Sequence, residues 1–193
     1  MTITGVILAG GLARRMNQQD KGLLLYRGQP LVSYAINALS PLVTELFISA
    51  NRHTDVYSQF GYQVLVDKNQ SFDGPLAGIL TALSVCQSPV LVVMPCDSPL
   101  IKTRHLQKLI TGLGNESADI AVAFDGQQRH NVFLALKTTL QSSLAAYLAS
   151  GERKIDSWLT QQRLTQVDFS QEKAVFANIN TPADLTALSD SED

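Results

Sequence analysis

The chain has 193 residues, a length typical of one domain. Apolar residues make up 45% of it and charged residues 17%, which excludes a chain that is disordered throughout. Fifteen Lys and Arg against seventeen Asp and Glu give a net charge of −2, so there is no global positive field for nucleic acid or an acidic membrane. We therefore expect no nucleic-acid or membrane partner, and any anionic ligand must be bound by a local cluster of cations.

The cysteine content and the N-terminal sequence indicate in which compartment the protein is found. Cys86 and Cys96 are too few for a disulfide framework and lack the spacing of a zinc site, so both are expected to be reduced interior thiols. No basic residue precedes the first apolar stretch, and no segment reaches the roughly 18 apolar residues needed to span a bilayer. The sequence therefore predicts a soluble, cytoplasmic protein.

Apolar runs alternate with segments of helical period, a pattern typical of a mostly parallel sheet covered by helices. In chain order, the sequence predicts a strand at 3–8, a helix at 30–39, strands at 46–49 and 64–66, a helix from 74 to about 86, and a strand at 90–94. The strand at 90–94 is apolar at every position, so we place it at the centre of the sheet with helices on both faces.

The second half of the chain continues the alternation. We expect a helix at 104–113, strands at 120–124 and 132–136, a helix at 140–149, a helical turn around Trp158, strands at 167–169 and 175–179, and a final helix opened by the capping box at 181–184. No linker or repeat interrupts the pattern. The prediction is a single α/β domain over 1–193, with three layers built around a mostly parallel central sheet.

Glycines, cations and carboxylates follow the predicted strands. Gly10 and Gly11 follow the first strand, Asp67 follows the strand at 64–66, and Asp97 follows the central strand. The carboxyl ends of parallel strands share one edge, where ligand crevices form. We therefore expect these residues to converge.

The segment from Leu8 to Lys21 has the composition of a phosphate-binding loop. Two adjacent glycines allow close approach of backbone amides, and Arg14, Arg15 and Lys21 supply positive charge. It is neither a Walker A loop nor a GxGxxG fingerprint. A solvated surface loop remains the alternative.

Asp97 is a candidate Mg²⁺ ligand, because a carboxylate held after a buried strand offers a hard oxygen on a rigid edge, with Pro95 and Pro99 restricting the backbone. The alternative is a turn or helix-cap aspartate. Asp67 has the same placement, and a strand-end turn residue is the alternative for it.

Three further features have two interpretations each. Gly78 costs helix stability, which indicates close approach by a ligand or close helix packing. Asn178 and Asn180 alternate on the last predicted strand, so they either read a polar ligand on one face or cap the following helix. The three histidines, His53, His105 and His130, are interpreted as surface residues, although His130 could border a second substrate.

No nucleophile or catalytic triad is recognisable. If the attacking group is a substrate phosphate, its second pKa near 6 leaves it ionised at neutral pH without a protein base. Positioning and charge neutralisation would then carry the catalysis.

The stretch LAGGLARRM at 8–16, followed by DKG at 20–22, resembles the N-terminal signature of the nucleoside-triphosphate-transferase superfamily. Its LAGG form is most similar to the molybdenum cofactor guanylyltransferase family. The resemblance continues through residues 30–31, 50–53, 74–78, 95–99, 151–153 and 178–182, and so covers nearly the whole chain.

This resemblance implies a Rossmann-like fold of the nucleotide-diphospho-sugar transferase type and an Mg²⁺-dependent transfer of GMP from GTP to the terminal phosphate of the molybdopterin cofactor. The products would be pyrophosphate and the guanine dinucleotide form of the cofactor. The implied partners are GTP and molybdopterin, together with cofactor-insertion enzymes, chaperones or apo-molybdoenzymes that receive the product.

The resemblance also implies roles for individual residues. Arg15, Lys21 and Asp97 would be catalytic, with Arg15 and Lys21 on the triphosphate and Asp97 on Mg²⁺. The implied nucleotide-binding residues are Leu8, Ala9, Gly10, Gly11, Lys21, Asn51, Asp67, Gly78 and Asp97. Asn178 and Asn180 would face the pterin.

Two positions depart from the family pattern. Asn17 stands where the family has glycine after the RRM sequence, and Ser49 stands where relatives can carry asparagine, which leaves Asn51 as the candidate nucleoside contact. Two rival functions stay open. One is a cytidylyl or sugar-phosphate nucleotidyltransferase, against which Gly11 speaks, and the other is a non-catalytic nucleotide-binding or cofactor-binding adapter.

Overall fold

A central sheet organises the computed structural model, which describes residues 2–10, 20–67, 74–114, 117–179 and 184. The strands of this sheet are β1 Ile3–Leu8, β4 Glu45–Ser49, β5 Gln63–Leu65, β6 Val90–Pro95, β7 Ile120–Phe124, β8 Arg129–Lys137 and β9 Leu164–Asp168. Within the described residues they lie in the order β5-β4-β1-β6-β8-β7-β9, and all neighbours pair in parallel except at β8. The predicted mostly parallel sheet, with β6 at its centre, is confirmed.

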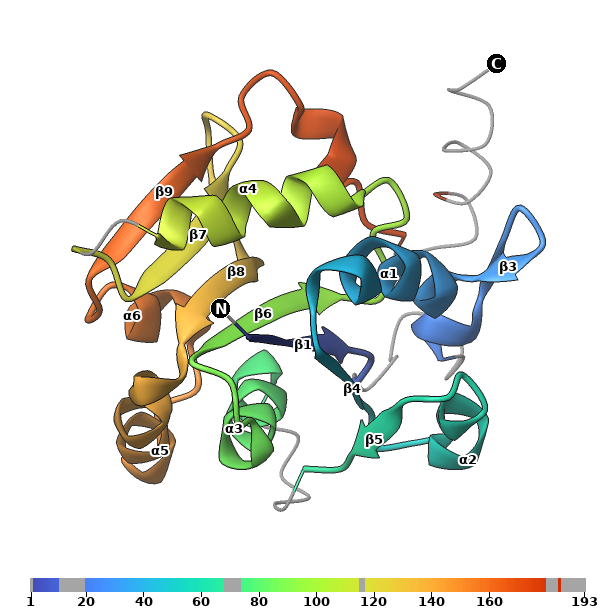
Figure 1. The fold of residues 1–193 in the computed structure, drawn as a ribbon, viewed down its shortest axis with the longest axis horizontal. Helices are drawn as coiled ribbons and strands as arrows, with labels where there is room; N and C mark the ends of the chain where they lie inside the picture. The colour runs from blue at the N-terminus through green and yellow to red at the C-terminus, as the bar shows by residue number, and fades with distance from the viewer. Residues whose placement is uncertain (1, 11–19, 68–73, 115–116, 180–183, 185–193) are drawn as a thin grey trace.

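Helices cover both faces of the sheet and complete the three layers (Figure 1). The α-helices are α1 Leu31–Leu39, α2 Thr54–Ser58, α3 Pro75–Val85, α4 Thr103–Leu113, α5 Gln141–Ala149 and α6 Ile155–Leu159. The 3₁₀-helices are η1 Lys21–Leu23, η2 Ser40–Leu42, η3 Thr138–Leu140 and η4 Lys173–Phe176. The helices α1 and α4 pack on one face, and α3, α5 and α6 pack on the other. Within the described part of the chain, no helix combines the length and apolarity needed to cross a bilayer.

The strand β6 shows why an uninterrupted apolar run belongs at the centre. Val92 and Met94 pack beneath α1 and α4, whereas Leu91 and Val93 pack beneath α3 and α5. All four side chains are fully buried. Successive residues of a strand point to opposite faces, so a strand covered on both sides needs apolar residues at every position.

Besides the short 3₁₀-helices, two elements were not predicted from the sequence. One is the hairpin formed by β2 Leu25–Tyr26 and β3 Gln29–Pro30, and the other is α2. The hairpin turns through Arg27 and Gly28, whose φ values of 48° and 78° are both positive, as a tight two-residue hairpin turn requires. Each element is too short to show a hydrophobic period in the sequence.

The predicted strand at 175–179 is wrong. Residues 173–176 form η4 instead, and no regular element includes residues 177–179. The apolar side chains are buried without strand pairing, because the ring of Phe176 stacks on His130 with centroids 4.0 Å apart and meets Phe169 edge-on at 5.2 Å. The expected alternation of Asn178 and Asn180 on one strand face therefore has no basis. Asn180, like the capping box at 181–184 except Asp184, lies outside the described residues.

Candidate active site

The carboxyl ends of four parallel strands bring the candidate residues to one edge of the sheet. In the strand register, Leu8 pairs with Ser49 on one side and with Pro95 on the other, and Ser49 in turn pairs with Leu65. The four residues therefore form one row across the sheet.

Each main candidate follows this row at the same offset. Gly10, Asn51, Asp67 and Asp97 each come two residues after their strand's member of the row. Backbone hydrogen bonds continue beyond the row: the Ala9 amide donates to the Ser49 carbonyl at 2.8 Å, the Ala50 amide to Leu65 at 3.0 Å and the Cys96 amide to Leu8 at 3.1 Å. The segments leaving the strands are thus held together, which places residues from four parts of the chain on one rim.

Asp97 and Lys21 form the charged centre of this rim. The Lys21 Nζ lies 3.5 Å from Asp97 Oδ2, with side-chain exposures of 30% and 14%. Burial raises the pKa of Asp97, and the Lys21 ammonium opposes that rise only in part. The second oxygen, Oδ1, is buried and has no hydrogen-bond partner among the described residues.

The unpartnered Oδ1 of Asp97 fits a hard cation. Mg²⁺ is usually bound by one or two carboxylates together with substrate phosphates and water, so it does not need a dedicated cage. The described residues contain no cluster of three or more His, Cys, Asp or Glu that could enclose a metal. Asp97 is therefore the described side chain best suited to hold Mg²⁺.

Asn51 and Asp67 form a polar clamp beside Gly10. The Asn51 Nδ2 donates to Asp67 Oδ2 at 2.8 Å, and the Asp67 amide donates back to Asn51 Oδ1 at 2.9 Å. Thr81 Oγ1 of α3 lies 3.2 Å from the remaining Asp67 oxygen and 2.9 Å from the Ala77 carbonyl oxygen, so its one proton can serve either acceptor. The Asp67 carboxylate therefore joins the ends of β4 and β5 and lies against α3.

Gly78 allows α3 to pack directly on the ends of β1 and β4. A Cβ at position 78 would lie 2.6 Å from Ser49 Oγ and 3.0 Å from Leu8 Cδ2. Close packing of the helix against the sheet therefore explains the glycine at this position. The small Ser49, which departs from the family pattern, occupies the space that glycine leaves.

Asn178 reaches the rim from the C-terminal part of the chain. The Ile179 amide donates to the Asp97 carbonyl at 2.9 Å, and Ser98 Oγ donates to Asn178 Oδ1 at 2.5 Å. Asn178 is exposed, so a ligand can reach it. Gly11 and Arg15 of the glycine-rich loop, together with Asn180, lie outside the described residues.

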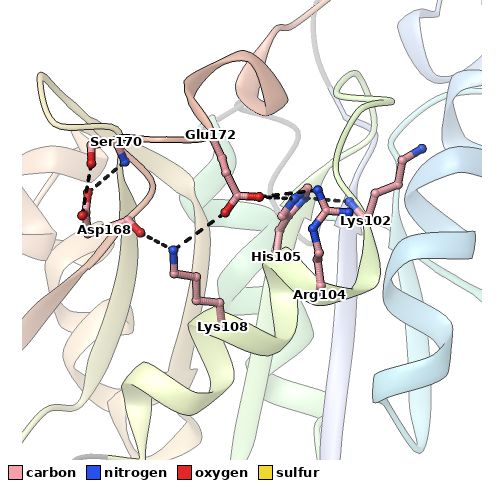
Figure 2. Close-up of polar contacts among 7 residues, drawn as sticks. All are labelled: Lys102, Arg104, His105, Lys108, Asp168, Ser170 and Glu172. Carbon is pink, nitrogen blue, oxygen red and sulfur yellow. Dashed lines mark hydrogen bonds and ion pairs between the residues drawn. The ribbon is translucent and has the colours of Figure 1, made fainter.

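A second polar cluster, centred on Glu172, lies between α4 and the segment after β9 (Figure 2). His105 Nε2 lies 3.1 Å from Glu172 Oε2, and Arg104 and Lys108 approach the same carboxylate at 3.5 and 3.9 Å. Lys108 also donates to the carbonyl oxygen of Asp168. Glu172 thus pairs with side chains of α4, and the cluster joins two segments of the fold.

The prediction that His105 lies on the surface is wrong, since only 2% of this residue is exposed. Its Nδ1 accepts a hydrogen bond from the Lys102 amide at 2.9 Å, which leaves Nε2 to donate to Glu172. His130 is also more enclosed than expected, because it stacks on Phe176 and lies 2.8 Å from an Asp125 oxygen. Both rings therefore have structural partners.

The chain is similar in sequence to known nucleotidyltransferases. Residues 5–167 match the MobA-like NTP transferase domain. The chain is 43% identical over 191 residues to the molybdenum cofactor guanylyltransferase of Shewanella sediminis (strain HAW-EB3), covering 99% of this chain and 97% of the relative. It is 44% identical over 180 residues to the protein of the same name from Shewanella frigidimarina (strain NCIMB 400), covering 93% and 92%.

Solved structures show the same fold at lower identity. Molybdopterin-guanine dinucleotide biosynthesis protein A from Archaeoglobus fulgidus superimposes with a TM-score of 0.82 at 21% identity, covering 98% of this chain and all of the other. A 4-diphosphocytidyl-2C-methyl-D-erythritol synthase from Anaerococcus prevotii DSM 20548 gives a TM-score of 0.75 at 11% identity, covering 99% and 98%. At these identities the likeness bears on the fold alone, which serves more than one nucleotide.

Proposed function

The chain belongs to the MobA-like NTP transferase family, and from this we propose that it transfers GMP from GTP to the terminal phosphate of the molybdopterin cofactor. Relatives that are 43–44% identical over nearly the full length carry the name molybdenum cofactor guanylyltransferase. The observation in the fold that best supports the proposal is the pairing of Lys21 with a buried, half-satisfied Asp97 at the carboxyl edge of the sheet.

The reaction is a substitution at the α-phosphorus of GTP. An oxygen of the cofactor's terminal phosphate forms the new bond, the bond from the α-phosphorus to the bridging oxygen breaks, and pyrophosphate leaves with that electron pair. A phosphate monoester with its second pKa near 6 is largely ionised at neutral pH, so the protein need not supply a base. The protein's task is to position two polyanions and to neutralise their charge.

The rim residues divide this task among them. Lys21 binds the triphosphate and offsets the charge that develops on the departing pyrophosphate, and Arg15 assists from the glycine-rich loop. Asp97 would hold Mg²⁺, and that ion would supply Lewis-acid stabilisation of the phosphate oxygens. Leu8, Ala9 and Gly10 provide the backbone edge against which the nucleotide lies, and Gly11 is assigned to the nucleotide as well.

The nucleoside and the pterin take the two sides of this centre. The Asn51–Asp67 clamp lines the nucleoside side, on the β4 and β5 part of the rim, and Gly78 lets α3 pack closely behind it. Asn178 faces the pterin on the other side, where it is bonded to Ser98 next to Asp97, and Asn180, which lies outside the described residues, is assigned to the pterin as well. This arrangement directs the cofactor phosphate and the α-phosphorus of GTP towards each other.

A nucleotide panel tests the proposal. Purified protein with Mg²⁺ and molybdopterin cofactor should release pyrophosphate with GTP, and mass spectrometry should find the guanine dinucleotide product. Turnover with CTP and not GTP would replace this function with the cytidylyl alternative. Tight GTP binding without any pyrophosphate release would favour the non-catalytic adapter.

A further inference from the structure

Lys21 lies between two residues that are fixed by contacts from elsewhere in the fold. Asp20 precedes it and is only 8% exposed, although it is a carboxylic acid. Its Oδ1 accepts hydrogen bonds from the Gly22 amide at 3.2 Å and from the Tyr57 hydroxyl at 2.5 Å. One buried oxygen thus joins η1 to α2.

Gly22, on the other side of Lys21, is enclosed as tightly. A Cβ at this position would lie 2.3 Å from the Tyr57 hydroxyl oxygen and 3.3 Å from Cys96 Sγ. Cys96 immediately precedes Asp97 in the chain. The backbone that carries Lys21 is therefore packed between Tyr57 and the segment that carries Asp97, which brings Nζ to Asp97 Oδ2.

Tyr57 cannot act on a substrate directly, because it is fully buried. Burial raises the pKa of its hydroxyl, and the neighbouring Cys96 and the hydrogen bond to Asp20 raise it further, while Arg52 opposes the rise. The phenol therefore keeps its proton and remains the donor to Asp20. Any effect of this hydroxyl on the reaction must pass through Asp20 and its neighbours.

We propose that Tyr57 is a positioning residue for Lys21: its hydroxyl fixes Asp20, and so fixes the direction in which the Lys21 ammonium points. This inference rests on the proposed role of Lys21 in binding the triphosphate. It assigns a role to a side chain of α2, an element that contributes no residue of its own to the rim. It also explains why a carboxylate precedes Lys21: Asp20 accepts hydrogen bonds from the Tyr57 hydroxyl and from the Gly22 amide.

The test is a double-mutant cycle on nucleotide affinity. Tyr57→Phe removes one hydroxyl and keeps the ring, and we expect GTP to bind roughly 5- to 10-fold more weakly, since one hydrogen bond contributes about 1 kcal/mol. Guanosine, which lacks phosphates, should bind as it does to wild type. In the Lys21→Ala background the same substitution should change GTP affinity less than about twofold, because the group it positions is gone.

A matched control comes from α5. The Tyr147 hydroxyl donates to the Lys154 carbonyl at 2.9 Å, and the residue is 7% exposed. Tyr147→Phe therefore removes a similar hydrogen bond on a helix that contributes no residue to the rim. This variant should bind GTP as wild type does. Asp20→Asn is a second, milder variant, because it keeps an acceptor oxygen for Tyr57, and its smaller loss of affinity should also disappear in the Lys21→Ala background.

Several outcomes would overturn the inference. They are GTP binding unchanged in Tyr57→Phe, an equal loss for guanosine, or an undiminished loss in the Lys21→Ala background. If Tyr57→Phe does not fold, the cycle is run with Asp20→Ala, which removes the oxygen to which Tyr57 donates. A wild-type preference for CTP would refute the proposed guanylyl transfer but not this inference, because the cycle can then be measured with CTP.

Discussion

The Lys21 ammonium lies 3.5 Å from Asp97 Oδ2, although the two residues are 76 positions apart in the chain. A partly exposed ion pair contributes about 0–1 kcal/mol to stability. An unpartnered buried oxygen such as Asp97 Oδ1 costs on the order of 1–3 kcal/mol. The arrangement therefore does not stabilise the fold, and groups held in this way are typical of a site that binds a further charge.

The Asp97 carboxylate should be essential for turnover and dispensable for folding. We expect Asp97→Asn to lower pyrophosphate release by about 100-fold or more, because an amide binds Mg²⁺ weakly. The melting temperature without ligands should stay within about 4 °C of wild type, since the substitution removes a buried charge that the fold satisfies only in part. Pyrophosphate release and calorimetry measure the two effects.

Asp55→Asn is the control for this substitution, because Asp55 is exposed on α2. It should leave both the rate of pyrophosphate release and the melting temperature unchanged. Wild-type turnover by Asp97→Asn at ordinary Mg²⁺ concentrations would remove Asp97 from the metal site.

The Lys21 side chain should matter mainly for the triphosphate. Lys21→Ala is expected to weaken GTP binding by about 10- to 100-fold, as for loss of a hydrogen bond to a charged group, with GMP affected much less. Lys21 also lowers the pKa of Asp97, so the variant should need a higher pH for full metal-dependent binding. Titration calorimetry across pH measures both effects, with the exposed Lys154→Ala as control. Equal losses for GTP and GMP would argue against a phosphate contact.

The packing of α3 on the sheet predicts that a second substitution restores the stability lost in Gly78→Ala. Gly78→Ala places a methyl group 2.6 Å from Ser49 Oγ, which should destabilise the protein by about 1–3 kcal/mol. Adding Ser49→Ala removes the nearest clashing atom, so the double variant should regain most of the lost stability. Urea unfolding of both single variants and the double variant gives the comparison. Additive losses would mean that the contact with Leu8 Cδ2, or a shift of the helix, dominates.

His105 should make stability depend on pH. Burial lowers the pKa of this ring, Arg104 lowers it further, and Glu172 opposes the change. Because the folded pKa lies below the ordinary value of 6.5, the unfolded chain takes up a proton first as pH falls. The contribution of His105 is therefore complete above about pH 6.5 and is lost as pH falls through the folded pKa.

The corresponding experiment compares melting temperatures between about pH 5 and pH 8. His105→Gln should be less stable than wild type at the upper end, and the difference should shrink towards the lower end. His53→Asn is the control for the loss of an exposed imidazole, because asparagine tolerates the left-handed backbone at this position, where φ is 49°. A constant difference between His105→Gln and wild type would show that protonation of this ring does not contribute.

Much of the fold follows from local patterns in the sequence. The predicted strands at 3–8 and 120–124 have the bounds of β1 and β7. For β7 the bounds follow from a continuous apolar run, which is typical of a strand buried on both faces. The helix α2 and the hairpin are too short to produce such a pattern. In the segment 175–179, Phe176 is buried by ring contacts with His130 and Phe169, and Ile179 packs with Tyr26 and Leu31, which a strand-like sequence pattern cannot reveal.

The candidate site also has features that the sequence predicts and features that it does not. Its convergence could be predicted, since parallel strands end at one edge and Asp67 and Asp97 follow their strands directly. The contribution of Tyr57 could not, because it depends on a hydrogen bond to Asp20 across 37 positions of sequence. The burial of His105 was likewise missed, because its partner Glu172 lies 67 positions away.

The most direct test of the account is a crystal structure with GTP and Mn²⁺, in which anomalous scattering locates the metal. We predict a metal peak about 2.1 Å from Asp97 Oδ1 and a phosphate oxygen about 3 Å from Lys21 Nζ. A nucleotide and metal bound elsewhere, with Lys21 and Asp97 paired only to each other, would contradict it.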